Sequence, residues 1–183
     1  MYTLDEHDKI EPVKKLPMDK EYIKDMATLF MTERLLLFEK SRQMMVTWTM
    51  VACHVWDALF FPGRRIAFQS KKEQDANHLV DRAKFIYSKL PEWMKAQFPM
   101  NPPSYCKLEF GKWNSGIYGI PQGPDQLRQY TFSRIFSDEL AFQDRTEEAY
   151  IAARPTITGG GSFVGVSSPN FKEFFYHLIR DQI

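Results

Sequence analysis

The sequence has 183 residues, enough for one domain with a single sizeable core. Hydrophobic residues make up 44% of the chain and aromatic residues 15%, a composition typical of a compact globule and not of a disordered chain. The charge is nearly balanced, with 24 basic against 23 acidic residues and no polybasic block, so the composition alone does not indicate strong nonspecific DNA binding.

Cysteine usage and hydropathy indicate the compartment. Cys53 and Cys106 lack the partner spacing of a zinc site, and so few cysteines in a chain of this size favour a reducing compartment, although a disulfide between them stays open. The polar, acidic N-terminus is unlike a signal peptide. No apolar run approaches the roughly 20 residues that a membrane span needs. We therefore expect a cytosolic protein without a membrane partner.

Strands and helices are expected to alternate along the chain. Residues 1–20 have mixed charges and two prolines, and we interpret them as an N-terminal arm. Apolar runs predict strands, and segments of helical periodicity predict the helices between them. Strands are expected at residues 34–38, 65–70, 107–110, 116–120, 131–137 and 162–167. Helices are expected at residues 21–30, 47–61, 73–90, 146–153 and 171–183.

Strands separated by helices pair in parallel through crossover connections. The order of elements therefore predicts an α/β fold with a doubly wound, mainly parallel sheet over residues 21–183. Ligands bind such sheets at the carboxyl ends of the strands. The polar clusters that follow several predicted strands are accordingly the candidate functional residues.

An acidic pair ends one of the predicted strands. The run Arg134-Ile-Phe-Ser-Asp-Glu139 places two carboxylates at the carboxyl end of a buried strand. In nucleoside-triphosphate hydrolases an acid in this position holds magnesium and a second acid activates water. We assign the first role to Asp138 and the second to Glu139. The alternative is a solvated acidic pair that lies in a turn or caps the following helix.

The loop from Lys40 to Thr47 has the register of a phosphate loop. The standard motif is Gly-x-x-x-x-Gly-Lys-Ser/Thr, in which glycines expose backbone amides and the lysine reaches the terminal phosphates. Here Met45 replaces the second glycine and Val46 replaces the lysine, whereas Thr47 keeps the hydroxyl that holds magnesium. Lys40 and Arg42 supply cations at the amino end of a helix, a suitable anion site. An ordinary strand–turn–helix is the alternative.

The loop resembles the deviant phosphate loop of the large terminase subunits of tailed phages, the ATPases that package DNA into procapsids. In that family the loop commonly begins Lys-x-Arg-Gln, and its lysine can occupy the early position that Lys40 has here. Three more segments match in the same order along the chain. Residues 65–76 resemble the second strand and its helix, Leu127-Arg128 resembles an arginine-bearing segment, and residues 164–170 resemble the coupling motif.

The resemblance implies a fold and a set of site residues. The fold is that of a P-loop NTPase of the RecA-like type with an additional strand and a catalytic glutamate. The residues implied to bind ATP are Lys40, Ser41, Arg42, Gln43, Met44, Met45, Val46 and Thr47. The residues implied to be catalytic are Glu139, Arg42 and Arg128, those for magnesium are Thr47 and Asp138, and those for coupling are Ser167 and Ser168.

Three of these roles have plain alternatives. Arg42 is either a phosphate contact or a surface arginine. Arg128 resembles the arginine finger that a neighbouring subunit inserts into the active site. An exposed loop arginine is an equally good interpretation. Ser167 and Ser168 resemble residues that sense the γ-phosphate, yet they are also suitable as strand-end hydroxyls before Pro169.

The function implied by the resemblance is that of an ATPase motor domain, with ATP and Mg²⁺, that drives double-stranded DNA into a procapsid. The implied partners are the DNA, the portal protein, the small terminase subunit and further copies in a ring, located at the portal in the host cytoplasm. The isolated domain is expected to be mainly monomeric, and the family's nuclease domain is expected to be absent from this chain. The alternatives are a helicase-type translocase, which the missing second lobe disfavours, and a nucleotide-binding assembly module with little hydrolysis.

Overall fold

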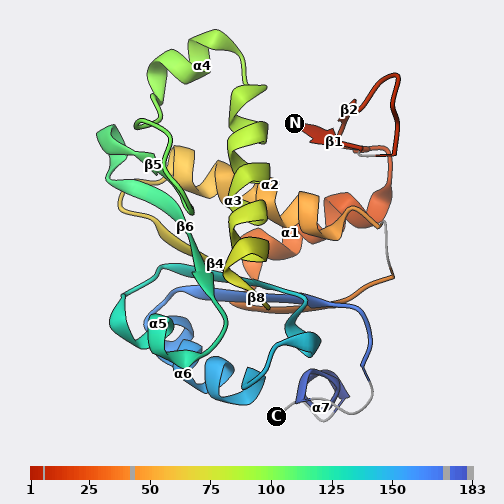
Figure 1. The fold of residues 1–183 in the computed structure, drawn as a ribbon, viewed down its shortest axis with the longest axis vertical. Helices are drawn as coiled ribbons and strands as arrows, with labels where there is room; N and C mark the ends of the chain where they lie inside the picture. Colours follow the sequence, from red (N-terminus) through yellow and green to blue (C-terminus); the bar gives the residue numbers. More distant parts are fainter. Residues whose placement is uncertain (6, 42–43, 171–173, 181–183) are drawn as a thin grey trace.

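A mixed sheet forms the centre of the computed structural model, which describes residues 1–5, 7–41, 44–170 and 174–180. Its strands are β3 (Leu35–Glu39), β4 (Arg65–Ser70), β5 (Lys107–Phe110), β6 (Ser115–Pro121), β7 (Arg134–Asp138) and β8 (Ser162–Ser167). Their order is β3-β8-β7-β4-β6-β5 (Figure 1). All neighbours pair in parallel except β5 and β6, which are antiparallel.

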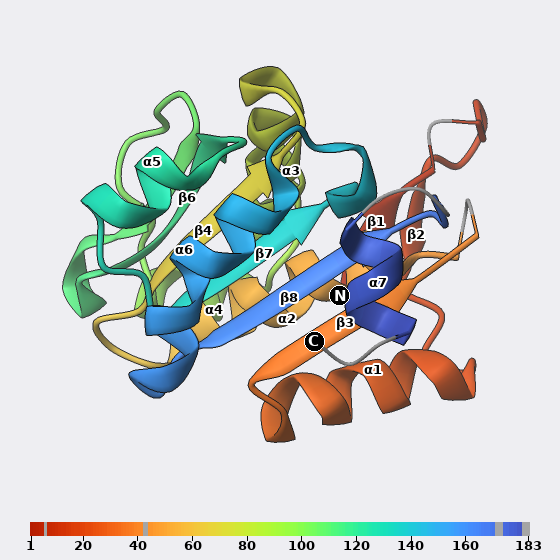
Figure 2. The ribbon, with the colours of Figure 1, turned by 90° about the horizontal axis from the view of Figure 1, so that it is seen from below.

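Helices cover both faces of this sheet (Figures 1 and 2). One face is covered by α1 (Glu21–Thr32), α2 (Val46–Phe60) and α3 (Glu73–Ser88), and the other by α5 (Pro124–Gln129), α6 (Thr146–Thr158) and α7 (Phe174–Arg180). The short helix α4 (Glu92–Gln97) follows α3. Each face has its own buried apolar cluster, so α2 and α3 pack in one core and α6 and α7 in the other. Within the described ranges, no helix has the length and apolar character to cross a membrane.

The doubly wound, mainly parallel α/β sheet expected from the sequence is confirmed. β8 lies between β3 and β7, and this is the additional strand of the RecA-like type. Every residue of β8 is buried, as expected of a central strand flanked by helices on both faces. Its parallel register sets Glu39 beside Ser167, and Asp138 beside Val166. The carboxyl ends of β3, β8 and β7 therefore meet at one edge of the sheet.

Several elements differ from their predicted bounds. The helix expected from residue 47 begins one residue earlier, at Val46, and α6 continues through Pro155 to Thr158. Pro155 is exposed, so water can satisfy the carbonyl that loses its partner. The short helices α4 and α5 were not expected. The last helix spans Phe174–Arg180, and the rest of its predicted range, residues 171–173 and 181–183, lies outside the described residues.

The N-terminal segment forms a hairpin, a structure absent from the predicted arm. The strands β1 (Tyr2–Leu4) and β2 (Val13–Lys15) pair antiparallel, and β1 contacts α3. The ammonium of Lys14 lies 3.1 Å from Asp5 and 2.9 Å from Asp8, so it neutralises two carboxylates of the connecting turn. Alternation in a three-residue strand is too short a pattern to recognise in sequence.

A buried ionic cluster connects α2 to β7. Asp57 of α2 has a side chain that is only 1% exposed, and it accepts hydrogen bonds of 3.0 and 3.3 Å from Arg134 at the start of β7. Arg64 Nε lies 3.2 Å from the same carboxylate. The Arg134 guanidinium also donates to Ser162 Oγ at 2.8 Å and lies 4.5 Å from the ring centroid of Phe30. Because a buried charge needs such partners, this cluster fixes the far end of α2 against the sheet.

Candidate functional site

The carboxyl ends of the three neighbouring strands bring the predicted polar residues together. Lys40 directly follows β3, Asp138 ends β7, and Ser167 ends β8. The Lys40 amide donates to the carbonyl of Ser167 at 2.9 Å, and the Ala141 amide donates to Ser167 Oγ at 3.1 Å. The buried hydroxyl of Ser167 therefore holds the turn after the acidic pair, and its neighbour Ser168 borders the groove described below.

Thr47 and Asp138 form the first of two contacts between the loop and the acidic pair. Thr47 Oγ1 lies 3.2 Å from both carboxylate oxygens of Asp138. Burial raises the pKa of Asp138 to about 6, because desolvation of the carboxylate outweighs the opposing field of Lys40. A hydroxyl and a carboxylate are hard oxygen ligands, which suit Mg²⁺ when phosphate oxygens complete the shell. These side chains therefore fit a magnesium ion that arrives with a polyphosphate.

Lys40 and Glu139 form the second contact. Lys40 Nζ lies 3.3 Å from Glu139 Oε1, and the lysine side chain is 12% exposed whereas the glutamate side chain is 41% exposed. Glu139 has a left-handed backbone conformation, with φ 52° and ψ 41°. Such a conformation costs a residue with a Cβ of order 1 kcal/mol or more, and strained residues of this kind cluster at functional sites. The turn directs Glu139 away from the strand while Asp138 stays buried.

The loop before α2 keeps a glycine-like bend without a glycine. Met45 has φ 59° and ψ 10°, a left-handed conformation at the position where the standard motif has its second glycine. The hydroxyl of Tyr22 donates to the Met44 carbonyl at 3.2 Å and so connects this loop to α1. Among the residues that the structure describes, no side chain caps α2, so the first-turn amides of this helix suit an anion. Ser41 is exposed.

Two residues of the predicted loop are not placed by the structure. Arg42, assigned to catalysis and ATP binding, and Gln43, assigned to ATP binding, lie outside the described residues. Their roles stay predictions. Val46 is buried as the first residue of α2, and its apolar side chain offers no donor to a phosphate.

A groove of about 1580 Å³ surrounds these contacts. Its floor contains Lys40, Thr47, Asp138 and Glu139. The sequence did not indicate its walls, which come from α3 and the N-terminal hairpin. The wall residues include Thr3, Lys14, Lys15, Asp75, His78, Arg82 and Phe85. The members from α3 recur at intervals of three and four residues and thus share one helix face, but the sequence does not show which partner that face meets.

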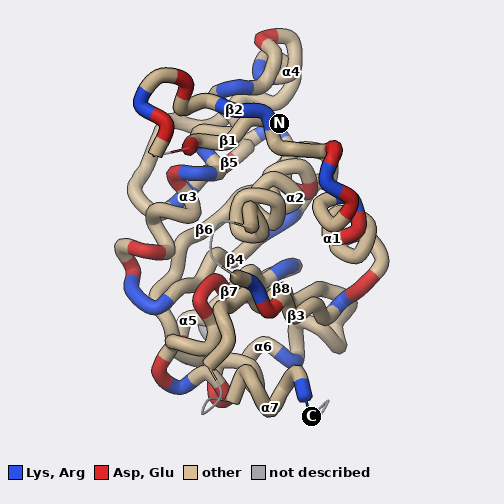
Figure 3. Tube along the Cα trace, turned by 90° about the vertical axis from the view of Figure 1, so that its right-hand side faces the viewer, with Lys and Arg blue, Asp and Glu red and all other residues tan. Residues whose placement is uncertain are grey.

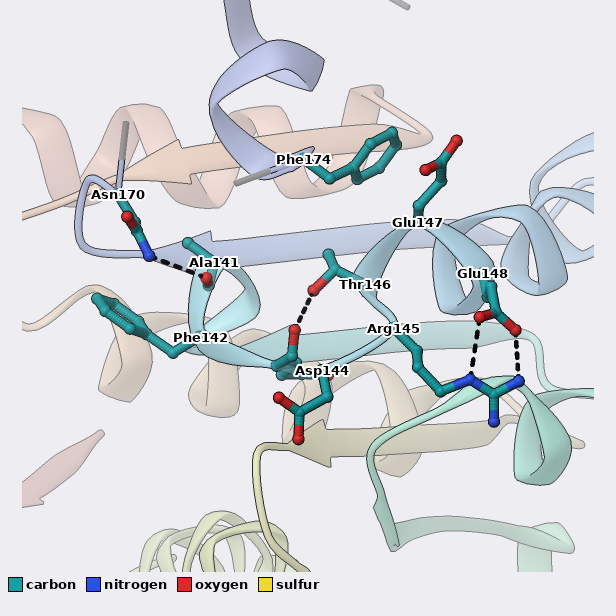
Figure 4. Close-up of a pocket in the computed structure, with 10 residues that line it drawn as sticks. Ala141, Phe142, Asp144, Arg145, Thr146, Glu147, Glu148, Asn170 and Phe174 are labelled. Carbon is teal, nitrogen blue, oxygen red and sulfur yellow. Dashed lines mark hydrogen bonds and ion pairs between the residues drawn. The ribbon is translucent and has the colours of Figure 1, made fainter. Parts of the chain in front are cut away.

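Arg128 lies outside this groove. It is an exposed residue of α5, which packs against α6 on the opposite face of the sheet from α2. A smaller pocket of about 420 Å³ lies on the same face, lined by the turn after Glu139, the start of α6, Asn170 and Phe174 (Figure 4). There Glu148 pairs with Arg145, and the field of Arg128 adds to that pairing in lowering the pKa of Glu148. The structure thus does not join Arg128 to the other predicted catalytic residues of its own chain.

Solved structures of phage large terminases have a similar fold. The large terminase of bacteriophage HK97 superimposes with a TM-score of 0.68 at 15% identity, over 94% of this chain and 37% of that one. The large terminase ATPase domain of Thermus phage P74-26 gives 0.56 at 15% identity, over 79% and 62%. The large terminase of a thermophilic bacteriophage, solved in complex with ADP, gives 0.62 at 13% identity, over 81% and 38%.

These likenesses establish the class of fold. The chain has the α/β, RecA-like fold that is also found in the ATPase domains of phage large terminases. It spans less than two thirds of the length of each of these proteins. No family model matches the sequence.

Proposed function

We propose that this chain is a nucleoside-triphosphatase domain of the large terminase type, which binds ATP with Mg²⁺ in the groove and hydrolyses it. The observation that carries the proposal is the pair of contacts Lys40–Glu139 and Thr47–Asp138, which join a phosphate-loop segment to an acidic strand end. The same fold is found in a large terminase solved with ADP and in one solved with ATP-γ-S.

The residues divide into binding and catalytic roles. Thr47 and Asp138 would hold the magnesium ion, and the amides at the start of α2 with Lys40 would hold the phosphates. Magnesium offsets the charge that develops on the phosphate oxygens. Glu139, which is partly exposed toward the groove, would orient and polarise the attacking water. Ser167 would couple the state of the nucleotide to the position of Glu139, because its hydroxyl accepts a hydrogen bond from Ala141 in the turn after Glu139.

A phosphate-release assay on the purified chain tests this proposal. Release from ATP should require magnesium and should stop when EDTA removes it. Asp138→Ala should weaken nucleotide binding in the presence of magnesium and have little effect on binding in its absence. A wild-type chain that binds ATP but releases no phosphate would instead support the second candidate, a nucleotide-binding assembly module. The replacement of the loop lysine by the buried Val46 favours that candidate.

The finer proposal is that hydrolysis drives packaging of double-stranded DNA into a procapsid. The partners would be the DNA, the portal protein, the small terminase subunit and other copies in a ring in the host cytoplasm. Basic and acidic positions are interspersed over the trace (Figure 3), so DNA engagement would need the assembled ring and not one copy. Stimulation of hydrolysis by double-stranded DNA only in the presence of portal would support it, and equal rates with and without both would contradict it.

A further inference from the structure

Arg82 is a basic residue of the groove that the predicted motifs do not include. It lies on α3, on the same helix face as His78 and Phe85, and its half-buried side chain borders the groove that contains Thr47 and Asp138. Its guanidinium carbon lies 5.3 Å from the ring centroid of Trp48, the residue directly after Thr47. The cation–π contact therefore holds the guanidinium beside the first turn of α2.

Arg82 and Lys40 are basic residues on the same groove. Both border it together with Thr47 and Asp138, the side chains proposed to hold magnesium. Among the residues that the structure describes, Arg82 forms no ion pair. Lys40, in contrast, is paired with Glu139. Arg82 thus has donors that a ligand of the groove can use.

The phosphate loop requires such a cation. In the standard motif the lysine before the threonine neutralises the terminal phosphates, and here that position is the apolar Val46. The planar fork of an arginine can donate two parallel hydrogen bonds to phosphate oxygens. We propose that Arg82 reaches from α3 to the terminal phosphate of a nucleoside triphosphate bound in the groove of its own chain, and with Lys40 supplies the charge that Val46 cannot.

This inference rests on the proposed function, because it requires a triphosphate in the groove. It differs from the finger role of Arg128, since Arg82 acts within one chain and before any assembly. It also predicts discrimination between ATP and ADP, because only ATP presents the terminal phosphate. A merely structural Arg82 that packs on Trp48 would not discriminate between the two nucleotides.

The test compares Arg82→Gln and Arg82→Lys with a control, Lys89→Gln. Lys89 follows the same helix and lies 5.5 Å from the ring centroid of Phe85, but it is exposed and does not border the groove. Binding of fluorescent ATP and ADP analogues would be titrated with magnesium, and thermal unfolding would be measured for each variant. Arg82→Gln should lose about tenfold or more in ATP affinity, the contribution of a charge-assisted hydrogen bond, and less than about threefold in ADP affinity. Arg82→Lys should recover part of the loss, and Lys89→Gln should bind as the wild type does.

The remaining outcomes separate two failures. Equal losses for ATP and ADP, or ATP binding by Arg82→Gln within about twofold of wild type, would overturn the contact with the terminal phosphate. A loss that follows a lowered unfolding temperature and is not restored by Arg82→Lys would likewise make Arg82 a packing residue only. If the wild-type chain binds neither nucleotide, the proposed function itself fails, and the inference fails with it.

Discussion

Lys40 and Glu139 are separated by 99 positions in the sequence, yet Lys40 Nζ lies 3.3 Å from Glu139 Oε1. The pair connects the strand before the phosphate loop to the strand that carries the acids, across the intervening β8. A bound triphosphate would compete with Glu139 for the ammonium, because both are anionic partners of the same group. Phosphate binding would then free the glutamate to accept a hydrogen bond from water. This relationship would link nucleotide binding to the availability of Glu139 for its proposed catalytic role.

The first prediction concerns Lys40 as the substitute for the missing loop lysine. Lys40→Ala should lower the affinity for ATP by about tenfold or more, because a charge-assisted hydrogen bond to phosphate is lost. Val46→Lys, which restores the standard motif, should be tolerated or should raise affinity. Titration with a fluorescent ATP analogue measures both. Normal binding by Lys40→Ala would show that Lys40 is dispensable and would transfer its role to Arg42.

The second prediction concerns Glu139. Glu139→Gln should reduce turnover by about 10²-fold or more while ATP binding is largely kept, because a group that acts on water contributes to the transition state and little to the ground state. Glu147→Gln is the matched control, since Glu147 is an exposed acid at the start of α6. Phosphate release and nucleotide binding are measured on the same samples. Undiminished turnover of Glu139→Gln would remove Glu139 from catalysis.

The third prediction concerns the anchoring of α2 at both of its ends. Thr47 contacts Asp138 at one end of β7, and Asp57 contacts Arg134 at the other. Asp57→Ala leaves the buried Arg134 guanidinium without its carboxylate and should lower the free energy of unfolding by about 3–5 kcal/mol.

The control for this anchor is Glu92→Ala, which removes the exposed partner of Lys95. An exposed pair contributes little, so this variant should change the free energy of unfolding by less than about 1 kcal/mol. Denaturant titration followed by circular dichroism compares the two. If Asp57→Ala and Glu92→Ala were equally stable, the buried cluster would not fix α2 to the sheet.

The fourth prediction concerns His54, a buried residue of α2 among the rings of Phe30, Phe68 and Phe136. Burial lowers the pKa of His54 from 6.5 to about 3, and the hydrogen bond between Nδ1 and the Met50 carbonyl offsets only part of this shift. Between these two values the unfolded chain binds a proton that the folded chain does not. The contribution of His54 to the free energy of unfolding is therefore fully present above about pH 6.5. Below that pH it declines by about 1.4 kcal/mol per pH unit.

The variant His54→Phe should remove this dependence, because phenylalanine fits the aromatic surroundings and does not titrate. Unfolding free energies of both proteins between pH 7 and pH 4.5 would be compared. As the pH falls, the free energy of unfolding of the wild type should decrease more steeply than that of the variant. The difference in slope should correspond to the binding of about one proton on unfolding. Parallel curves would mean that His54 does not contribute to acid sensitivity.

The sequence predicted the floor of the site because its elements are defined locally. Mainly apolar runs gave β4 and β8 their bounds, and the polar residues after parallel strands of this kind had to meet at one edge of the sheet. The strand before the acids was predicted too long. Residue Ser133 lies outside β7, although its amide donates to the Arg65 carbonyl at 2.8 Å and its hydroxyl both donates to that carbonyl and accepts from the Arg65 amide, each at 3.0 Å.

The walls of the site could not be predicted in the same way. Lys14 and Arg82 lie in the groove because α3 packs against α2 and the N-terminal hairpin against α3, and this packing depends on side chains that are distant in sequence. The left-handed conformation of Met45 could not be predicted either, because methionine rarely adopts a positive φ. The sequence showed only that the glycine of the standard motif was missing. Local patterns identify the chemistry of the strand ends, whereas the residues that enclose a ligand follow from tertiary packing.

The last prediction concerns Arg128 and assembly. Arg128 is exposed on the face of the sheet opposite α2, so it can complete a site only in a neighbouring copy. Fingers supplied by a partner contribute about 10³- to 10⁵-fold in rate, so the chain should be a slow, mainly monomeric ATPase when dilute. Its specific activity should rise with protein concentration. Arg128→Ala should abolish that rise, whereas the control Arg154→Ala, another exposed arginine on the same face, should not.

Mixing two variants with complementary defects gives the sharper form of this test. Arg128→Ala retains Glu139, and Glu139→Ala retains Arg128, so an interface between the two can contain one complete site. Phosphate release from the mixture at high protein concentration should exceed the sum of the separate rates, and dilution should remove the excess because the interface dissociates. If the mixture released phosphate no faster than the sum of the separate rates at every concentration, Arg128 would be a surface residue with no role in a neighbouring site. The site would then depend on cations of its own copy, Lys40 and Arg82.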